Sequence, residues 1–254
     1  ETRSYPYGNV FAHVIGYSDP ELGNTGLESV ENFELLTSNA FFLEKLQNEF
    51  SDSKNRGDTV VTTLDADLQQ ASYDALGDNR GAVVVMEADT GKILSMVSKP
   101  DYDPNTVYSD WSSLNSDEEN SPLLNRATQG SYAPGSTFKI VTTLAFMRQN
   151  SNYQDYSYDC VGEITTGDTT IHCFNGTVHG YEDLGASIAN SCNASFANIG
   201  TMLDIDEYRN TAEDLLFNSS LPSVLGYTKS SFALTSDSGE AEIMMTAMGQ
   251  GKTT

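Results

Sequence analysis

The chain has 254 residues, enough for one large domain or two smaller ones, and 38% of them are hydrophobic, so we expect a folded globular protein. The 36 acidic residues against 13 basic residues give a formal net charge of -23. Binding to nucleic acid or to an anionic membrane surface depends on clustered Lys and Arg, so this charge excludes both as expected partners.

The first part of the chain is rich in Gly, Asn, Ser and acidic residues, which is typical of a loop-rich accessory segment. One helix is predicted over about 38–50, where apolar residues recur at helical spacing between Phe41 and Phe50. The composition changes shortly after Gly57. We therefore predict an N-terminal segment over 1–57 and a second domain over 58–254.

The second domain opens with local signals of regular structure. "TVVTTL", at 59–64, is a β-branched run typical of a strand, and a helix is predicted over 65–76 with an Asp at its start. Two apolar runs within 81–98 are joined by Asp-Thr-Gly-Lys, which predicts a hairpin whose Gly91 supplies the positive φ of the turn. Both runs are apolar at almost every position, which predicts a sheet covered on both faces.

The remainder of the chain is mostly helical in pattern. A long polar connection is expected over 101–122, and helices are predicted over about 184–189, 194–203 and 205–216. A hairpin followed mainly by helices favours a mixed α/β class.

Three cysteines leave two alternatives open. Cys160 and Cys173 bracket a short Gly- and Thr-rich stretch, so they form either a disulfide, as in an oxidising compartment, or two free thiols, as in a cytosolic one; the third is Cys192. A metal site built from Cys160, His172, Cys173 and His179 is disfavoured, because the spacing matches no zinc pattern. No bound metal is expected.

The most informative stretch is "APGSTFKIVTTLAFM", residues 133–147. Ser136 and Lys139 are one turn apart, near the N-terminus of a helix whose apolar residues surround almost its whole circumference, so the helix is predicted to be buried. Burial and the positive end of the helix dipole both disfavour an ammonium group there. A neutral Lys139 amine can then act as the general base for the Ser136 hydroxyl.

A second constellation, Ser191-Cys192-Asn193, lies between two predicted helices. A hydroxyl such as that of Ser191 can pass a proton between the lysine and a leaving amine, and the Asn193 amide offers a donor and an acceptor to a peptide-like substrate. Taken singly, either residue is better explained as an ordinary helix cap.

Together these blocks resemble the penicillin-binding proteins, in particular the class B transpeptidases. The resemblance runs through "RSYPYGNVFAHVIGY", "GNTGLE", "TLDADLQQASYDAL", "GAVVVMEADTGKILSMVSKPDYDPN", "LLNRATQGSYAPGSTFK", "HGYEDLGASIANSCNASFANIG" and "MGQG", in the family's order. The family signature combines S-x-x-K with an S-x-N form and K-T-G. The fold implied is the penicillin-binding, β-lactamase-like transpeptidase fold, an antiparallel sheet flanked by helices, with a small N-terminal pedestal.

The resemblance also implies roles and partners. Ser136 would be the acylated nucleophile, Lys139 its base, Ser191 a proton relay and Asn193 a substrate-binding residue. The substrates would be D-Ala-D-Ala stem peptides of peptidoglycan, with β-lactams trapping the acyl-enzyme, and the protein partners would be a glycosyltransferase or other cell-wall synthesis proteins. No metal or organic cofactor is implied. The family is anchored in the cytoplasmic membrane and faces outward, a location that agrees with a Cys160–Cys173 disulfide.

The third motif departs from the family pattern. Lys252-Thr253-Thr254 directly follows Gly249-Gln250-Gly251, which in the family lies well before the K-T-G strand, so Lys252 is interpreted as a loop residue. We therefore expect the chain to stop before that motif, and after the family's membrane anchor, and to be nearly inactive by itself. A D,D-carboxypeptidase, a β-lactamase, or a β-lactam-binding sensor or scaffold without turnover are the alternative functions.

Overall fold

The computed structural model describes residues 3–37 and 57–254, so the helix predicted over about 38–50 lies outside the described residues. The chain divides into two compact units, Glu1–Gly130 with Ser223–Thr228, and Ser131–Pro222 with Lys229–Thr254. This division by contacts does not test the boundary near Gly57, which stays a prediction.

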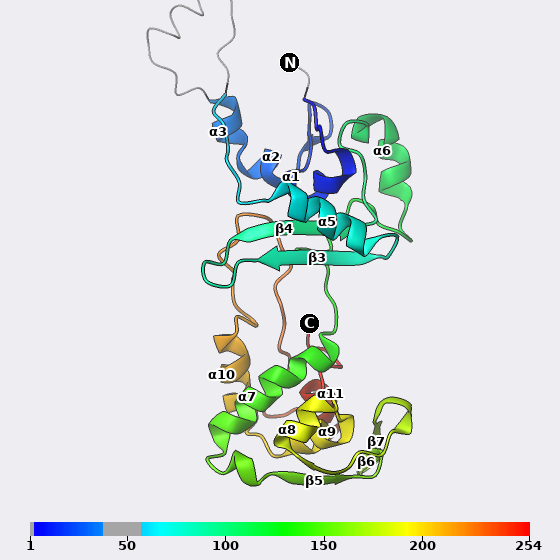
Figure 1. The fold of residues 1–254 in the computed structure, drawn as a ribbon, viewed down its shortest axis with the longest axis vertical. Coiled ribbons are helices and arrows are strands. Elements are labelled where there is room, and N and C mark those ends of the chain that lie inside the picture. The colour runs from blue at the N-terminus through cyan, green and yellow to red at the C-terminus, as the bar shows by residue number, and fades with distance from the viewer. Residues whose placement is uncertain (1–2, 38–56) are drawn as a thin grey trace, which may run out of the picture. The chain divides into compact units, whose positions relative to one another are not determined.

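The first unit combines short helices with a hairpin (Figure 1). Its elements are η1 (Gly8–Phe11), α1 (Ala12–Ile15), β1 (Ser18–Asp19), β2 (Gly23–Asn24), α2 (Gly26–Val30), α3 (Asn32–Leu36), α5 (Ala66–Leu76), β3 (Gly81–Met86), β4 (Ile93–Lys99) and α6 (Val107–Ser116).

Helix α5 confirms the helix predicted over 65–76. The carboxylate of Asp65 accepts a hydrogen bond from the Leu68 N–H at 2.8 Å and so caps the helix. The side of α5 that packs on the hairpin carries Gln69, which is fully buried. Its amide donates to the carbonyls of Val10 and Met96 and accepts from the Met96 N–H, at 2.7–2.8 Å. A buried amide with these partners joins α5, β4 and the N-terminal turn at little desolvation cost.

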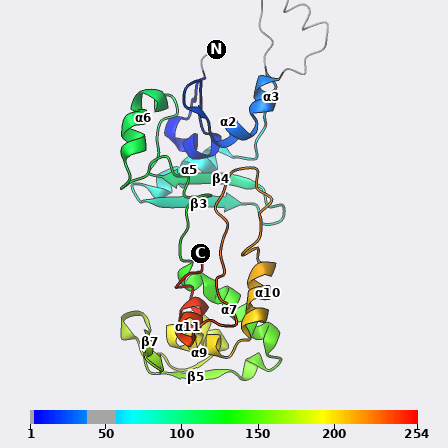
Figure 2. The same cartoon turned by 180° about the vertical axis from the view of Figure 1, so that it is seen from behind.

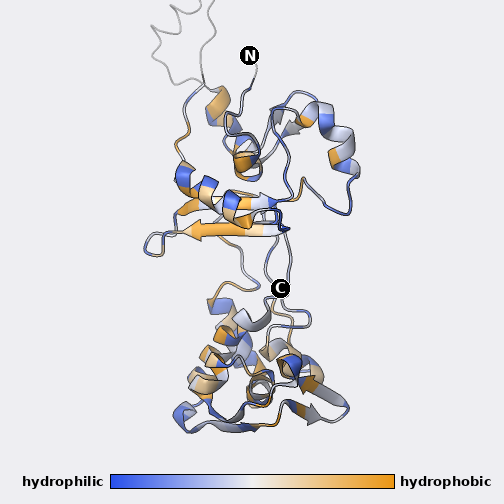
Figure 3. Cartoon of the chain, turned by 45° about the vertical axis from the view of Figure 1, so that its right-hand side comes forward, coloured by the Kyte–Doolittle hydropathy of each residue, from blue (hydrophilic) through white to orange (hydrophobic). Residues whose placement is uncertain are grey.

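The antiparallel β3–β4 hairpin is confirmed, with Gly91 at φ +74° in its turn. Both strands are strongly hydrophobic (Figure 3), but only β4 is largely buried. Along β3, half-buried and exposed residues alternate, and Val84 and Met86 are exposed. The prediction of two covered faces is therefore wrong for β3 in this structure, because α5 and the N-terminal helices pack mainly on β4.

Two local predictions in the first unit are wrong. The β-branched run at 59–64 forms no strand, and its Val61 side chain is exposed. Within 101–122, predicted to be a polar connection, lies helix α6. Val107, Trp111 and Leu114 recur at helical spacing in α6 and pack in an apolar cluster with Tyr102.

The second unit is mainly helical (Figure 2), and its short strands pair as β5–β8 and β6–β7. Its elements are η2 (Gly135–Phe138), α7 (Lys139–Gln149), η3 (Tyr153–Asp155), β5 (Ser157–Cys160), β6 (Glu163–Thr166), β7 (Thr169–His172), η4 (Phe174–Gly176), β8 (Gly180–Asp183), α8 (Leu184–Ala189), α9 (Asn193–Thr201), α10 (Ile205–Asp214) and α11 (Glu240–Ala247). Helices α8, α9 and α10 confirm the three predicted there, and the predicted mixture of helix and strand is confirmed for the chain.

One apolar core organises this unit. It contains Phe138 and Phe146 from the turn and helix that begin at Gly135, and Phe196 and Ile199 from α9. Helices α9 and α11 approach so closely that a Cβ on Gly200 would lie 2.6 Å from Ala247 Cβ. Among the described residues, no helix has both the length and the apolar composition that crossing a membrane requires.

Candidate active site

Ser136 lies in a tight turn that leads directly into α7. The turn η2 continues into the helix at Lys139, whose backbone N–H donates to the Ser136 carbonyl. The Ser136 side chain is exposed, whereas Phe138, two residues later, is buried. The Phe138 ring packs against the rings of Tyr208, Phe217 and Phe232. A deeply anchored turn thus presents the Ser136 hydroxyl to the outside.

A pair of glycines fixes the start of this turn. Gly135 has a φ of +59°, and its N–H donates to the Gly249 carbonyl at 2.8 Å. Gly249 has a φ of +79°, and a Cβ there would lie 1.9 Å from the Gly135 carbonyl oxygen. Only glycine accepts both the backbone conformation and this close approach. The sequence "MGQG" therefore supports the turn that carries Ser136.

Lys139 is buried, with 3% of its surface exposed, and its Nζ atom has three oxygen partners. They are the Ser191 carbonyl oxygen at 2.7 Å, Ser191 Oγ at 3.0 Å and Asn193 Oδ1 at 2.7 Å. The structure thus brings Lys139 together with the Ser-Cys-Asn loop, 52 and 54 residues away in the sequence. The helix itself is less buried than predicted, because Ile140 and Met147 are exposed.

These three contacts differ in what they allow chemically. The Ser191 carbonyl and Asn193 Oδ1 can only accept hydrogen bonds, so they hold two N–H groups of Lys139 in either charge state. The Ser191 hydroxyl can accept from an ammonium or donate to the lone pair of a neutral amine. Proton exchange between Lys139 and Ser191 therefore needs no rearrangement of the other two bonds.

Burial lowers the pKa of Lys139 to about 8, although the nearby Cys192, Cys173 and Glu182 side chains oppose this effect. The desolvation of the ammonium is the larger influence. A substantial fraction of Lys139 is then neutral at mildly alkaline pH, as a general base requires.

Hydrogen bonds fix the Ser191–Asn193 loop, which binds Lys139 Nζ. Ser191 has a positive φ of +50°, which is uncommon for a residue other than glycine. Its N–H donates to the Ile188 carbonyl at 3.0 Å, and the Cys192 N–H donates to the Ser187 carbonyl at 3.0 Å. The Asn193 amide nitrogen donates to the His172 carbonyl at 3.0 Å. Strained backbone held by neighbouring bonds is frequent at functional sites.

Sequence reasoning missed one acidic residue near this site. Glu182 on β8 is almost fully buried, with one carboxylate oxygen accepting from the Asn190 amide at 2.8 Å. Its other oxygen has no hydrogen-bond partner among the described residues. An acidic residue in a strand whose other positions alternate in burial is a weak signal, because the sequence does not show which face is covered.

The three cysteines are free thiols in the structure, in place of the Cys160–Cys173 disulfide that the sequence allowed. The Sγ atoms of Cys160 and Cys173 are 3.7 Å apart, and Cys173 Sγ is 3.7 Å from Cys192 Sγ. His172, one member of the disfavoured metal set, points elsewhere and contacts Glu163 at 3.0 Å. Lys252 is exposed and pairs with Glu242 at 3.3 Å.

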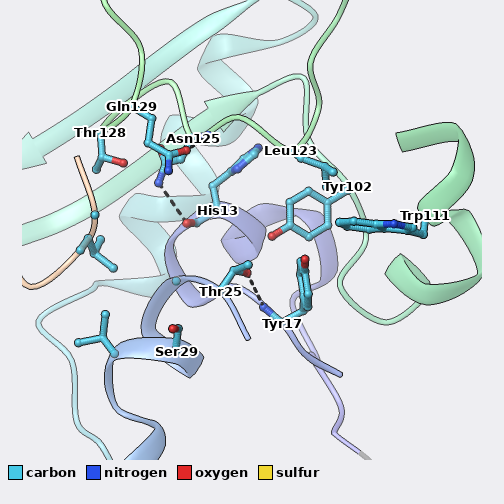
Figure 4. Close-up of a pocket in the computed structure, with 14 residues that line it drawn as sticks. His13, Tyr17, Thr25, Ser29, Tyr102, Trp111, Leu123, Asn125, Thr128 and Gln129 are labelled. Atoms are coloured by element: carbon cyan, nitrogen blue, oxygen red, sulfur yellow. Dashed lines mark hydrogen bonds between the residues drawn. The ribbon is translucent and has the colours of Figure 1, made fainter. Parts of the chain in front are cut away.

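A separate pocket of about 370 Å³ lies in the first unit and contains none of the predicted site residues. The rings of Tyr17, Tyr102 and Trp111 form one wall in edge-to-face contacts (Figure 4). His13 lines it with Nε2 3.2 Å from the Pro100 carbonyl, and burial lowers the pKa of His13. The remaining lining residues are Thr25, Gly26, Ser29, Val30, Leu123, Asn125, Thr128, Gln129, Leu225 and Gly226.

Comparison with known families assigns both parts of the chain. Residues 81–254 match the penicillin binding protein transpeptidase domain, and residues 2–60 match the penicillin binding protein A dimerisation domain. The chain therefore belongs to the penicillin-binding protein transpeptidase family. This confirms the resemblance inferred from the sequence blocks.

Individual relatives support the same family assignment. The chain is 35% identical over 229 residues to the peptidoglycan D,D-transpeptidase PbpA of Mycolicibacterium smegmatis, covering 83% of this chain and 46% of that relative. It is 33% identical to PbpA of Mycobacterium tuberculosis, covering 98% of this chain and 54% of the relative. The chain thus spans about half the length of these curated relatives.

Solved structures confirm the predicted transpeptidase fold. The M. tuberculosis penicillin-binding protein A, solved as an imipenem acyl-enzyme complex, matches with a TM-score of 0.88 at 30% identity, over 98% of this chain and 61% of that one. The D,D-transpeptidase domain of a peptidoglycan glycosyltransferase from Eggerthella lenta matches with a TM-score of 0.85 at 32% identity, over 98% and 56%.

Proposed function

We propose that the protein is a serine D,D-transpeptidase that cross-links peptidoglycan stem peptides and is acylated by β-lactams. The observation that carries the proposal is the buried Lys139 amine, which is bonded to Ser191 and Asn193 and belongs to a residue one turn after the exposed Ser136. Relatives named D,D-transpeptidases, and one solved as acyl-enzymes with imipenem and with penicillin G, support it.

In the proposed reaction, Ser136 Oγ attacks the carbonyl carbon of the penultimate D-Ala, and Lys139 takes the hydroxyl proton. The C–N bond to the terminal D-Ala breaks, and the proton reaches the leaving nitrogen through the Ser191 hydroxyl. An amine of a neighbouring stem peptide then attacks the ester and gives up a proton, which Lys139 passes to Ser136 Oγ as the ester C–O bond breaks and the cross-link forms. With a β-lactam the broken amide is in the ring, so the leaving nitrogen stays attached and the ester persists.

We propose that Asn193 binds both Lys139 and the substrate. Its Oδ1 is bonded to Lys139 and one N–H goes to the His172 carbonyl, which leaves the second N–H of the amide for a substrate carbonyl.

The proposed cellular location and domain division of the protein are those of its family. We propose that the protein acts at the outer face of the cytoplasmic membrane, where peptidoglycan is assembled, with 1–57 as the pedestal segment and 58–254 in the transpeptidase domain. Its proposed protein partner is a glycosyltransferase that makes the glycan strands, because cross-linking needs newly made strands.

The test is covalent labelling of the protein, expressed at its full natural length, with a fluorescent penicillin followed by peptide mass spectrometry. We expect one adduct per chain, on Ser136, and its complete loss in Ser136→Ala. Thr137→Ala, which removes a neighbouring exposed hydroxyl of the same turn, should still be labelled. An adduct on another residue, or unchanged labelling of Ser136→Ala, would disprove the assignment.

Product analysis separates the proposed reaction from its alternatives. Given a D-Ala-D-Ala peptide and an amine acceptor, a transpeptidase forms the amide with the acceptor. Release of the shortened free acid would indicate a carboxypeptidase, rapid loss of the penicillin adduct a β-lactamase, and a stable adduct without peptide turnover a sensor.

A further inference from the structure

Four side chains with metal-binding atoms converge in the second unit, beside the Ser-Cys-Asn loop. They are Cys160, Cys173, His179 and Cys192, whose ligand atoms all lie within 4.8 Å of one another. The three cysteines are buried and His179 is partly buried. Three of these residues belong to the metal site that was disfavoured from the sequence, and Cys192 replaces its fourth member, His172.

Three distances between the ligand atoms match the edges of a tetrahedral site. Zinc binds sulfur at about 2.3 Å and nitrogen at about 2.0–2.1 Å, so a tetrahedron has sulfur–sulfur edges of about 3.8 Å and sulfur–nitrogen edges of about 3.6 Å. The Cys160–Cys173 and Cys173–Cys192 sulfur pairs are both 3.7 Å apart, and Cys160 Sγ is 3.4 Å from His179 Nδ1.

The fold presents these four groups from separate elements. Cys160 is the last residue of β5 and pairs with Gly180 of β8, which places His179 next to Cys160. The Cys173 N–H donates a hydrogen bond to the Gly162 carbonyl at 2.9 Å, which fixes the backbone at Cys173. Cys192 is the N-cap of α9. Because the strand pairing rather than the sequence spacing sets this geometry, no zinc spacing pattern was visible in the sequence.

Backbone N–H groups also point at two of the sulfur atoms. The Gly162 N–H donates to Cys160 Sγ and the Ser195 N–H donates to Cys192 Sγ, both at 3.4 Å. Backbone donors around metal-bound sulfur orient the ligand and neutralise part of its charge.

Simpler explanations account for fewer of these contacts. A disulfide would use two of the thiols and leave the third buried beside them. A purely apolar cysteine cluster is common in protein cores, but it does not need the imidazole nitrogen of His179 directed at Cys160 Sγ. We propose that Cys160, Cys173, His179 and Cys192 bind one zinc ion in a tetrahedral site.

With four protein ligands the site is closed, so the ion is structural rather than catalytic. Cys192 is flanked by Ser191 and Asn193, both bonded to Lys139 Nζ, so the ion would hold the loop that positions the lysine. This consequence rests on the proposed function, whereas metal binding itself does not.

The experiment measures metal content and a metal spectrum on the full-length protein, purified under reducing conditions without chelator. Elemental mass spectrometry should find about one zinc per chain. Replacement of zinc by Co²⁺ should give thiolate-to-cobalt charge-transfer bands in the near ultraviolet and the intense visible bands of a tetrahedral site. Both readouts are independent of enzyme activity.

Two histidine variants form a matched pair. His179→Gln should lower zinc affinity by at least the roughly 10–100-fold that loss of an outer-sphere partner costs, whereas His172→Gln, on an exposed residue, should keep full occupancy. Hydrogen exchange of the Ser191–Asn193 peptide should accelerate when zinc is removed by a chelator, which tests the effect on the loop even if a variant folds poorly.

Several results would overturn the proposal. These are wild-type protein without stoichiometric zinc and without a tetrahedral cobalt spectrum, equal loss of metal in His172→Gln and His179→Gln, or alkylation of only one of Cys160, Cys173 and Cys192 in the metal-free, denatured protein purified without reductant. The last result would indicate a disulfide. Failure of penicillin to label Ser136 would refute the proposed function and leave the metal measurement unaffected.

Discussion

Asn193 Oδ1 accepts a hydrogen bond from Lys139 Nζ at 2.7 Å, so a charge introduced at this position would act directly on the lysine. In the unmodified protein, acylation by penicillin should rise with pH through about 8, because the neutral amine is the base and burial lowers the pKa of Lys139 to about that value. In Asn193→Asp the new carboxylate stabilises the ammonium and should raise the midpoint by about 1–3 pH units.

The measurement is the acylation rate against pH for both proteins. Asn198→Asp is the matched control, because Asn198 lies on the same helix and its amide bonds to Tyr156 rather than to Lys139. A midpoint that stays in place in Asn193→Asp, or moves equally in the control, would contradict the assignment of the midpoint to Lys139.

At the scale of elements, the turn before α7 depends on the contact between Gly135 and Gly249. Gly249→Ala should destabilise the protein by more than Gly251→Ala and should slow acylation of Ser136. Both glycines have φ near +80°, so both substitutions incur a left-handed backbone cost of roughly 1–2 kcal/mol. Only at Gly249 does the new Cβ also meet backbone, 1.9 Å from the Gly135 carbonyl oxygen, whereas at Gly251 the nearest atom is 3.9 Å away.

Denaturant unfolding and acylation kinetics of the two variants check this prediction. Overpacking typically adds about 1–3 kcal/mol, so the difference in unfolding free energy should be within reach of the method. Equal losses in the two variants would mean that the close approach does not hold the turn.

Local signals explain which elements could be predicted from the sequence. Helix α5 and the β3–β4 hairpin were predictable because a capping Asp65 and a positive-φ Gly91 act within a few residues of the chain. Helix α6 was missed because its four Ser residues outweighed the spacing of Val107, Trp111 and Leu114. The run at 59–64 has strand propensity, but its side chains are mostly exposed, and propensity alone does not create a strand.

The site was predictable where it depends on a single turn or loop. Ser136 and Lys139 are one turn apart, and the Ser-Cys-Asn loop carries its own motif. The burial of Glu182 and the approach of His179 to Cys160 depend on the pairing of β5 with β8, which sequence spacing does not encode.

At the scale of the whole molecule, the net charge of -23 sets the response to salt. Self-repulsion of a strongly charged chain destabilises the compact state, and salt screens it over a Debye length of about 8 Å at physiological ionic strength. We expect the melting temperature to rise by about 2–4 °C between low and physiological ionic strength, which corresponds to about 1 kcal/mol. Scanning calorimetry measures this, and a falling melting temperature would show that attractive ion pairs outweigh the repulsion.

The most direct test of the central claim, that the Lys139 amine removes the proton of Ser136, is the single-turnover acylation rate of Lys139→Arg. Arginine keeps the positive charge and the donors but does not lose its proton in proteins. The claim predicts a fall of about 10²–10⁴-fold, the usual contribution of a general base, in a variant that still folds. A folded Lys139→Arg protein that is acylated on Ser136 at the unmodified rate would contradict it.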